Sequence, residues 1–396
     1  MKPFRCFAAA TTAATAIALS AAEPWFLPAQ ADADTLALAD FESETPAGSD
    51  AKGLDLMRGA QLGNGRFGKG LVLGSGRDYA RLQTTEAAQF GRKDPFTVEL
   101  WVRPERGARG ALWTLATRYY LHAGSKAQFG YRAAAFPIRY TGLPQLRLPA
   151  ETWSHVALTH DEDMTVTVTV DGREIARIAH KDEGDYAKAS DRLNIGSHDV
   201  WTGFFKGAFD DVRISRGVRS YRPLLQEQYL LEDEHLRLAV DPESLPETVQ
   251  HIRIAVRQNG RTHYETTVEP RAADRPLVPA ADLPAGRSDV HLTFVDREGR
   301  ALSTVSAPVE NAQARYGALE DRLRLVRRIA AAVEDDAADA GTILDTYLPG
   351  IEEALERRRL PKAESLLAAA EHLGARIAAD EAAYRTRLRS FIHPQP

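Results

Sequence analysis

Apolar and polar residues alternate along the first half of the chain, which predicts short β-strands. Between Met164 and Val170, three valines alternate with threonines, and Asp171-Gly172 then supplies the positive φ angles of a tight hairpin turn. Trp101 lies opposite the apolar face of its strand, so we expect that strand to be covered on both sides. Strands are also predicted at residues 36–42, 71–73, 96–102, 153–159, 193–196 and 207–214. Many short strands with such turns favour a mainly β fold, a sandwich or jelly roll.

A second, smaller β unit is predicted at residues 236–309. Ile252, Ile254 and Val256 recur at every second position, and Asn259-Gly260 makes another hairpin turn. We interpret this unit as a small immunoglobulin-like or fibronectin-like β-sandwich.

The apolar period changes to three and four residues in the last part of the chain, residues 310–396, as in amphipathic helices. One stripe runs from Tyr316 to Val333, and a second runs from Ile343 to Leu355, interrupted by Pro349-Gly350. Pro361 can open a third helix as its first residue. The pattern predicts a C-terminal helical hairpin or bundle with coiled-coil-like packing.

Residues 1–31 are predicted to be a cleaved signal peptide. Lys2 and Arg5 precede an alanine-rich apolar run, and Ala29-Gln30-Ala31 has the small-x-small pattern of a cleavage site. Ser20-Ala21-Ala22 is a second candidate for the cut. We therefore expect a secreted or periplasmic protein, or one held at a bacterial cell surface.

Composition narrows the class of protein further. The only cysteine, Cys6, lies in the predicted leader, which excludes disulfides and thiolate zinc sites from the mature chain. The formal net charge is −5 with both signs interspersed, so no nucleic-acid partner is indicated. No segment after the leader is long and apolar enough for a membrane span.

Four short motifs and one hairpin carry a resemblance to a known family. They are residues 68–73, 96–102, 153–157 and 207–214 and the turn at 170–172. In this order they resemble the LamG-like jelly roll of the concanavalin A-like lectin and glucanase superfamily. The resemblance implies a concanavalin A-like β-sandwich at residues 32–235 that binds glycans or proteins, mostly without catalysis and often with a structural calcium ion. Residues 108–147 match poorly, which makes them a place for ligand loops.

Adjacent acids in the last predicted strand are the most unusual charged residues. Val212 and Ile214 should face the core, and strand alternation puts Asp210 on their side. A buried carboxylate needs a cation, an arginine or backbone amides. One interpretation, which the resemblance also implies, is a calcium ion shared with acids of the first strand. The alternative is that Asp210 binds Arg213 or a backbone turn while Asp211 is solvated. The predicted metal ligands are Asp40, Glu42, Asp210 and Asp211.

Aromatic side chains are the candidate ligand surface, because sugar rings stack on exposed aromatic faces. They lie in the poorly matching region and in the loop before the last strand. Trp201 and Tyr120 are the preferred sugar platform, whereas Trp113, close to two leucines, is expected to be buried. The predicted ligand-binding residues are Tyr119, Tyr120, His122, Trp201 and Phe204.

Glycoside hydrolase or lyase activity is a further alternative, since glucanases of this superfamily place two carboxylates two or four residues apart on one strand. Glu42 with Glu44 and Asp161 with Asp163 have this spacing, but Pro46 ends the first strand and the second pair lies in a turn. No nucleophile elbow, phosphate loop or HExxH motif is present. We therefore predict no catalytic residues and no enzyme.

The sequence favours an exported, non-catalytic binding protein. Its jelly roll is expected to recognise a polysaccharide or a cell-surface glycoconjugate, with calcium as a structural cofactor. The alternative is a structural or assembly protein, in which the jelly roll binds protein and the C-terminal helices self-associate or dock to a protein partner.

Overall fold

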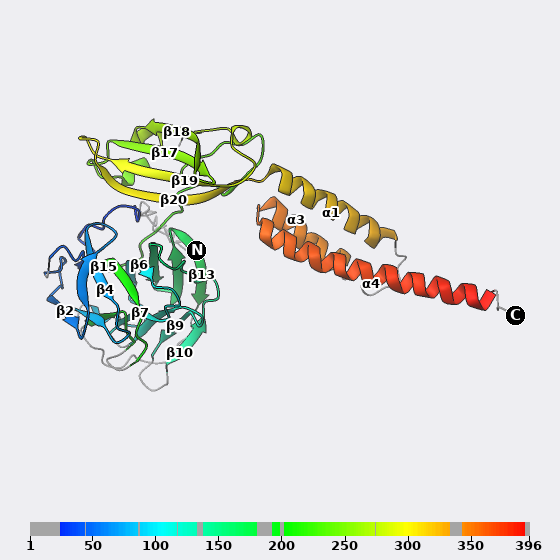
Figure 1. Cartoon of the computed structure of the whole chain (residues 1–396). Helices are drawn as coiled ribbons and strands as arrows, with labels where there is room; N and C mark the ends of the chain where they lie inside the picture. The colour runs from blue at the N-terminus through cyan, green and yellow to red at the C-terminus, as the bar shows by residue number, and fades with distance from the viewer. Residues whose placement is uncertain are drawn as a thin grey trace, which may run out of the picture. The chain divides into compact units, whose positions relative to one another are not determined.

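The computed structural model shows a mainly β chain that ends in helices, as the sequence predicted (Figure 1). Two compact units make up the chain, residues 1–224 with 240–248 and residues 225–239 with 249–396. They are called unit 1 and unit 2 below. The structure describes residues 24–43, 45–85, 88–116, 118–132, 138–179, 192–198, 202–273, 275–332 and 343–392.

Unit 1 is built from an eight-stranded and a seven-stranded antiparallel sheet. The first contains β1 (Thr35–Ala39), β3 (Gln61–Asn64), β4 (Lys69–Leu73), β6 (Phe96–Pro104), β11 (Ser154–His160), β12 (Thr165–Val170), β13 (Arg173–Ala179) and β15 (Gly207–Arg216). Its order is β13-β12-β11-β6-β15-β4-β3, with β1 also paired to β15. The second contains β2 (Gly53–Met57), β5 (Tyr79–Gln83), β7 (Gly110–Leu115), β8 (Tyr119–Ala123), β9 (Gln128–Tyr131), β10 (Arg139–Gly142) and β14 (Arg192–Ile195). Its order is β10-β9-β8-β7-β14-β5-β2.

The predicted alternation matches the core of unit 1. Phe96 and Val98 on β6, Val168 on β12 and the predicted core residue Trp113 are all fully buried in one hydrophobic cluster. The hairpin between β12 and β13 turns at Asp171 and Gly172, whose φ angles are 49° and 73°. Period-two alternation and turn chemistry therefore predicted this sandwich correctly.

The face of the eight-stranded sheet that points away from the core is covered as well. Trp101 on β6 is only 3% exposed. Its ring lies 5.8 Å from that of Trp25 and 5.7 Å from that of Phe67, between ring centroids. The indole N–H of Trp25 donates to the carbonyl of Arg222 (2.8 Å), and Phe26 is buried beside it. The expectation that β6 is covered on both faces is confirmed.

The N-terminal segment, residues 24–34, therefore packs on the folded unit, and a signal peptide that ends at residue 31 stays a prediction. A cut after Ala31 would remove Trp25 and the Ala29 N–H, which donates to the Asp211 carboxylate (2.8 Å). It would also remove the Gln30 carbonyl, which accepts from Arg213 (3.0 Å). The second candidate cut, at residues 20–22, lies outside the described residues and leaves the segment intact.

Within its described residues, unit 2 contains one five-stranded sheet where the sequence predicted a small sandwich. The strands are β16 (Tyr229–Leu230), β17 (His251–Gln258), β18 (Arg261–Val268), β19 (Gly286–Val295) and β20 (Ala301–Asn311), in the order β16-β20-β19-β17-β18. Asn259 and Gly260, at φ 51° and 78°, form the predicted hairpin turn. Because β16 pairs with β20, this unit begins before the predicted boundary after His235.

Irregular segments take the place of a second sheet in unit 2. Single bridges join Leu225 to Leu238 and His235 to Pro279, and the side-chain amide of Asn311 donates to the carbonyl of Ala280 (3.0 Å). Proline has no N–H to donate to a β ladder, so four prolines between residues 270 and 284 disfavour regular strands there. The prolines are Pro270, Pro276, Pro279 and Pro284.

The C-terminal helices form a bundle, as predicted. They are α1 (Gln313–Ala332), α3 (Leu348–Glu356), which follows a π-helical turn at Ile343–Tyr347, and α4 (Leu360–Ile392). Leu323, Ile351 and Leu367 lie in their shared core. Ion pairs join residues 315 to 364 and 322 to 371, so α1 and α4 run in parallel. None of the helices within the described residues is both long and apolar enough to cross a membrane.

Replacing Trp25 with alanine is expected to lower the free energy of unfolding by about 3–5 kcal/mol, the usual cost of truncating a buried tryptophan or phenylalanine. The variant loses the indole contacts with Trp101 and the hydrogen bond to Arg222. Urea unfolding of a chain that begins at Glu23 measures the change.

Trp153→Ala is the matched control, because Trp153 is half-buried and its ring contacts the Arg103 guanidinium at 5.2 Å. It should cost much less stability than Trp25→Ala. A chain that begins at Asp32 should be destabilised at least as much as Trp25→Ala. Equal stability of the chains that begin at Glu23 and at Asp32 would contradict a structural role for the N-terminal segment.

Candidate functional site

Asp210 and Asp211 form a β-bulge in β15, and the bulge overturns the predicted orientation of Asp210. β15 pairs Asp210 with Trp101 on β6, the register then shifts, and pairing resumes at Arg213 with Glu99. Asp211 has a φ of 45°. One extra residue reverses the alternation, so Asp210 shares the outer face with Trp101 instead of the core face.

The bulge lies where one edge of β15 changes partner. β4 pairs with residues 207–209, whereas β1 pairs with residues 212–215. Asp40 and Glu42 follow the last residue of β1 and so reach the same place. Burial is the main cause that raises the pKa of Asp210 and that of Asp211, and the charges of Glu42 and Asp40, respectively, add to these shifts. The four predicted metal ligands, Asp40, Glu42, Asp210 and Asp211, therefore lie in the same region of unit 1 and are called the acidic bulge below.

Backbone N–H groups satisfy the two central carboxylates. Oδ2 of Asp210 accepts from the N–H groups of Arg66 (2.6 Å) and Phe67 (2.8 Å), and Oδ1 accepts from that of Asp211 (2.8 Å). This is the predicted alternative of a backbone turn. Asp211 is 4% exposed and accepts from Ala29, so the expectation that it is solvated is wrong.

The acidic bulge has the donor chemistry of a calcium site but not a complete geometry. Burial raises the pKa of Asp210 to about 6 and that of Asp211 to about 8, and neighbouring carboxylates add to both shifts. Calcium binds carboxylate and carbonyl oxygens, so the residue types fit. Within the described parts of the chain, however, no three acidic or histidine side chains form a group that could hold a metal. Calcium at the acidic bulge stays a prediction.

A buried ion pair lies beside the bulge on the same face. Nε of Arg213 donates to Oε1 of Glu99 (2.5 Å), and Nε2 of His155 lies 2.9 Å from Oε2. Burial alone would raise the pKa of Glu99, but Arg213 and His155 bring it down to about 2. The Trp25 ring stacks on His155 at 5.6 Å between centroids. This covered face is structural, so a ligand must be sought elsewhere on unit 1.

The seven-stranded sheet offers the other outward face. On β8, Tyr119 and Leu121 belong to the core cluster, so alternation sends Tyr120 and His122 outwards. The T-shaped neighbour of Tyr120 is His198, at 4.5 Å between ring centroids. We call this surface, made of Tyr120, His122, Tyr140 and His198, the histidine–tyrosine face.

Tyr140 is the exposed aromatic of this face. It pairs with Gly130 on β9, and a Cβ at Gly130 would lie 2.6 Å from the Tyr140 ring, so glycine lets the ring lie on the backbone. The side chain is 42% exposed. His122 lies 6.1 Å from Tyr140 and 5.2 Å from His198, between ring centroids. The result is an open aromatic ring beside two imidazoles.

His122 is neutral at pH 7 in this environment. Burial, followed by the nearby His198, lowers its pKa to about 4. Its Nε2 is buried without a hydrogen-bond partner. A neutral imidazole donates a hydrogen bond from one ring nitrogen and accepts one at the other, and of these two atoms Nε2 is closed to solvent.

The structure places the five predicted ligand residues in different environments. Tyr119 is a core residue, 1% exposed and packed against Phe96, so its prediction as a ligand contact is wrong. Tyr120 is 3% exposed and His122 is half-buried on the outward face. Phe204 packs on Tyr79 (6.2 Å) beneath the Arg58 guanidinium (5.2 Å). Trp201 lies outside the described residues.

Sequence reasoning missed Tyr140 and His198. Both needed the tertiary structure, because their rings come close to that of His122 only in the folded sheet. One signal was available: Tyr140 lies within residues 108–147, the region already marked as a place for ligand loops.

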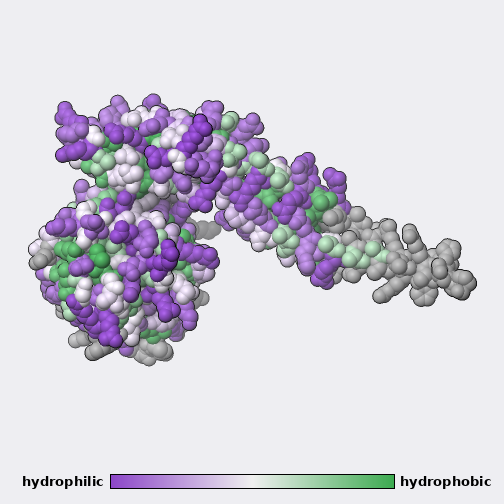
Figure 2. Space-filling view, viewed as in Figure 1, coloured by the Kyte–Doolittle hydropathy of each residue, from purple (hydrophilic) through white to green (hydrophobic). Residues whose placement is uncertain are grey.

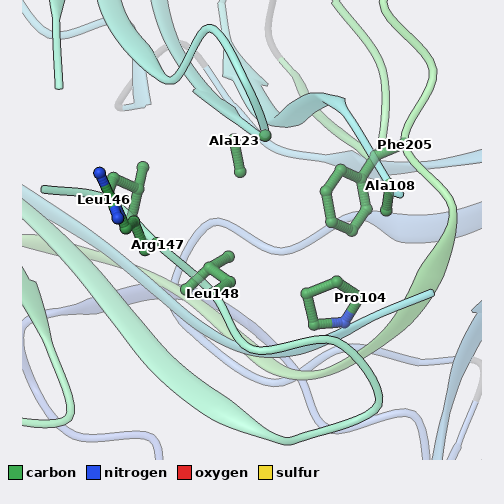
Figure 3. Close-up of a pocket in the computed structure, with 8 residues that line it drawn as sticks. Pro104, Ala108, Ala123, Leu146, Arg147, Leu148 and Phe205 are labelled. Carbon is green, nitrogen blue, oxygen red and sulfur yellow. The ribbon is translucent and has the colours of Figure 1, made fainter. Parts of the chain in front are cut away.

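A groove adjoins the histidine–tyrosine face at one end of the sandwich, and we call it the end groove. It has two cavities of about 220 Å³ and about 460 Å³ that share Gly124, Leu146 and Arg147. Gly142 lines the larger cavity and pairs with Gln128, which pairs with His122. Figure 3 shows the side chains of the smaller cavity around a common space. They include Pro104, Ala108, Ala123, Leu148 and Phe205.

Comparison with known proteins agrees with this architecture. Residues 74–222 match the family model described as the concanavalin A-like lectin/glucanases superfamily. Unit 1 is a concanavalin A-like domain. The matched part of this domain contains Asp210, Asp211 and the whole histidine–tyrosine face, but not Asp40, Glu42 or the N-terminal segment. No curated protein matches the chain.

Solved structures with a similar fold include domain 4 of AbnA, a GH43 extracellular arabinanase from Geobacillus stearothermophilus, in complex with arabinotriose. It is 17% identical, with 47% of this chain and 94% of that chain covered and a TM-score of 0.39. The binding domain of Paraclostridial Mosquitocidal Protein 1 is 14% identical, with 47% and 49% covered and a TM-score of 0.39. The botulinum neurotoxin serotype D ligand binding domain in complex with N-acetylneuraminic acid is 11% identical, with 68% and 72% covered and a TM-score of 0.39. At these identities and TM-scores, the three matches carry no conclusion about what this chain binds.

The low pKa of His122 predicts a loss of stability on acidification. Its folded pKa of about 4 lies below the ordinary 6.5, so between these values the unfolded chain binds a proton that the folded chain does not. The free energy of unfolding is therefore expected to fall as the pH drops from 6.5 towards 4. His122→Gln should remove this contribution, which urea unfolding between pH 4 and pH 8 measures.

His263→Gln serves as the control, because His263 is exposed on β18. Its unfolding free energy should follow the wild-type pH dependence. Parallel curves for wild type and His122→Gln across the acidic window would show that His122 is not held neutral.

Calcium binding at the acidic bulge predicts a calcium-dependent melting temperature. An ion that binds only the folded chain stabilises it by mass action, so excess calcium should raise the wild-type Tm and excess chelator should lower it. Asp211→Asn should abolish both shifts, while Asp163→Asn, in an exposed turn, should keep them. If neither calcium nor chelator moves the wild-type Tm, the prediction is wrong.

Proposed function

We propose that this is an exported, non-catalytic carbohydrate-binding protein, whose concanavalin A-like domain holds a glycan on the histidine–tyrosine face and in the end groove. The observation that carries the proposal is the exposed Tyr140 ring lying on Gly130 beside His122. An aromatic ring of this kind stacks on the C–H face of a sugar, and nearby polar groups bind its hydroxyls.

The closed face of the eight-stranded sheet supports this choice of site. Trp101, Glu99 and Asp210 on that face are all at most 3% exposed, so it cannot accept a ligand without losing the N-terminal segment. The seven-stranded sheet keeps Tyr140 exposed, and the end groove begins beside it. In the view of Figure 2 the surface of unit 1 is mostly hydrophilic, with hydrophobic residues in small patches, which suits a polar ligand.

The acid pairs with glucanase spacing support binding without catalysis. Glu42 belongs to the acidic bulge, where its Oε1 accepts from the N–H of Lys69 (2.6 Å), and Glu44 lies outside the described residues. Asp161 stabilises its own turn by accepting from the N–H groups of Asp163 (3.0 Å) and Thr165 (2.8 Å). Of the described acids, Asp161 and Asp163 therefore belong to a turn and do not flank a ligand groove.

Tyr140→Ala is expected to weaken glycan binding at least about tenfold, because truncating an aromatic anchor commonly costs about 2 kcal/mol or more. The full chain is first screened on a glycan array, and the affinity for the best glycan is then measured by titration calorimetry. Tyr140→Phe should bind nearly as well as wild type, because it keeps the ring.

Val218→Ala is the matched control, since Val218 is another exposed apolar residue of the same unit, 47% exposed and outside the site. Its affinity should equal that of the wild type. Loss of binding in Val218→Ala, or none in Tyr140→Ala, would place the ligand elsewhere. A chain that binds no glycan but self-associates would favour the alternative function, an assembly protein that acts through its C-terminal helices.

A further inference from the structure

The end groove lies in the most basic part of the chain. Between Arg103 and Ala150 there are eight lysine and arginine residues against one acidic residue, Glu105, although the whole chain has a net charge of −5. Six of these eight cations are exposed. They are Arg106, Arg109, Lys126, Arg132, Arg139 and Arg147.

Three of these cations gather at the groove itself. Lys126 and Arg147 line the larger cavity, and Arg147 also lines the smaller one. A Cβ on Gly124 would lie 2.7 Å from the Cβ of Arg109, so the backbone of Arg109 packs directly on this shared wall. Glycine at this position, with φ 104°, allows that close approach.

These three cations form no ion pair with any residue that the structure describes. Nε of Arg147 donates only to the carbonyl of Pro144 (3.3 Å), a neutral acceptor. The acids near the groove lie at its Pro104 end, where Glu151 accepts from the N–H of Arg106 (3.3 Å) and Glu105 follows Pro104. Elsewhere in the chain, exposed arginines such as Arg177 and Arg324 are paired with acids of their own element. The groove therefore presents positive charge that is free to meet a ligand.

We propose that the end groove recognises an anionic glycan, a polysaccharide whose sugar units carry carboxylate groups. This inference rests on the proposed carbohydrate-binding function and adds the chemical class of the ligand. The apolar wall of Pro104, Leu148 and Phe205 suits the C–H face of a sugar ring, and Lys126 and Arg147 meet its carboxylate. The larger cavity, at about 460 Å³, lies within the usual range for small-ligand sites, about 300–1,000 Å³.

The test compares acidic polysaccharides with their own neutral forms. Polygalacturonate, alginate and hyaluronate are each offered to the full chain beside the carboxyl-reduced polymer, and affinity is measured by titration calorimetry. At least one acidic polymer should bind at least about tenfold more tightly than its reduced form, and added salt should weaken that binding by screening. Lys126→Glu and Arg147→Glu should each weaken it at least about tenfold.

Lys93→Glu and Arg77→Glu are the matched controls, because both residues are exposed in unit 1, lie outside the groove and change the net charge by the same amount. They should bind like wild type, and thermal melting should show all four variants folded. Equal loss in the controls would reduce the effect to net charge and overturn the groove assignment.

The two proposals fail in different ways. If the chain binds neutral glycans as well as acidic ones, or only neutral ones, the anionic class is overturned while carbohydrate binding stands. If it binds no glycan on the array and none of the acidic polymers, both proposals fail. If it binds a random single-stranded oligonucleotide as tightly as the acidic polymers, the groove is a general polyanion site and the glycan assignment is overturned.

Discussion

The buried ion pair between Glu99 and Arg213 is the interaction on which the arrangement of unit 1 depends. It joins β6 to β15 just beyond the bulge, and both side chains are almost fully buried. Breaking a buried pair by removing one partner typically costs about 3–5 kcal/mol, because it leaves an uncompensated charge. The pair must also be shielded from solvent by other residues, because its strength depends on the exclusion of water. The N-terminal segment supplies that cover, with Gln30 accepting from Arg213 and Trp25 stacked on His155.

This cover decides where a ligand can bind. Closing one outer face with residues 24–34 leaves the face of the seven-stranded sheet and the end of the sandwich as the open surfaces of the domain. Tyr140, the imidazoles of His122 and His198, and the basic groove lie there. The two faces therefore differ in role: one uses charge internally to hold strands together, and the other keeps Tyr140, Lys126 and Arg147 exposed.

Sequence reasoning succeeded where structure follows from neighbouring residues. The alternation in residues 96–102 and 164–170 identified the core face, and Asp171-Gly172 and Asn259-Gly260 identified two turns, because backbone geometry sets both within a few residues. It failed at Asp210, where one bulged residue reversed the alternation. It also predicted both Tyr119 and Tyr120 as ligand-binding residues, although neighbouring residues on a strand point to opposite faces and Tyr119 lies in the core.

The sequence by itself determined the mainly β class, the jelly-roll resemblance, the helical end and the general region in which ligand residues lie. Only the tertiary structure decided that residues 24–31 pack on unit 1, that Asp40 and Glu42 lie near the bulge, and that Tyr140 lies beside His122. These features depend on contacts between residues far apart in the chain. Such contacts arise from strand register and from which segment covers which face, and no local pattern encodes them.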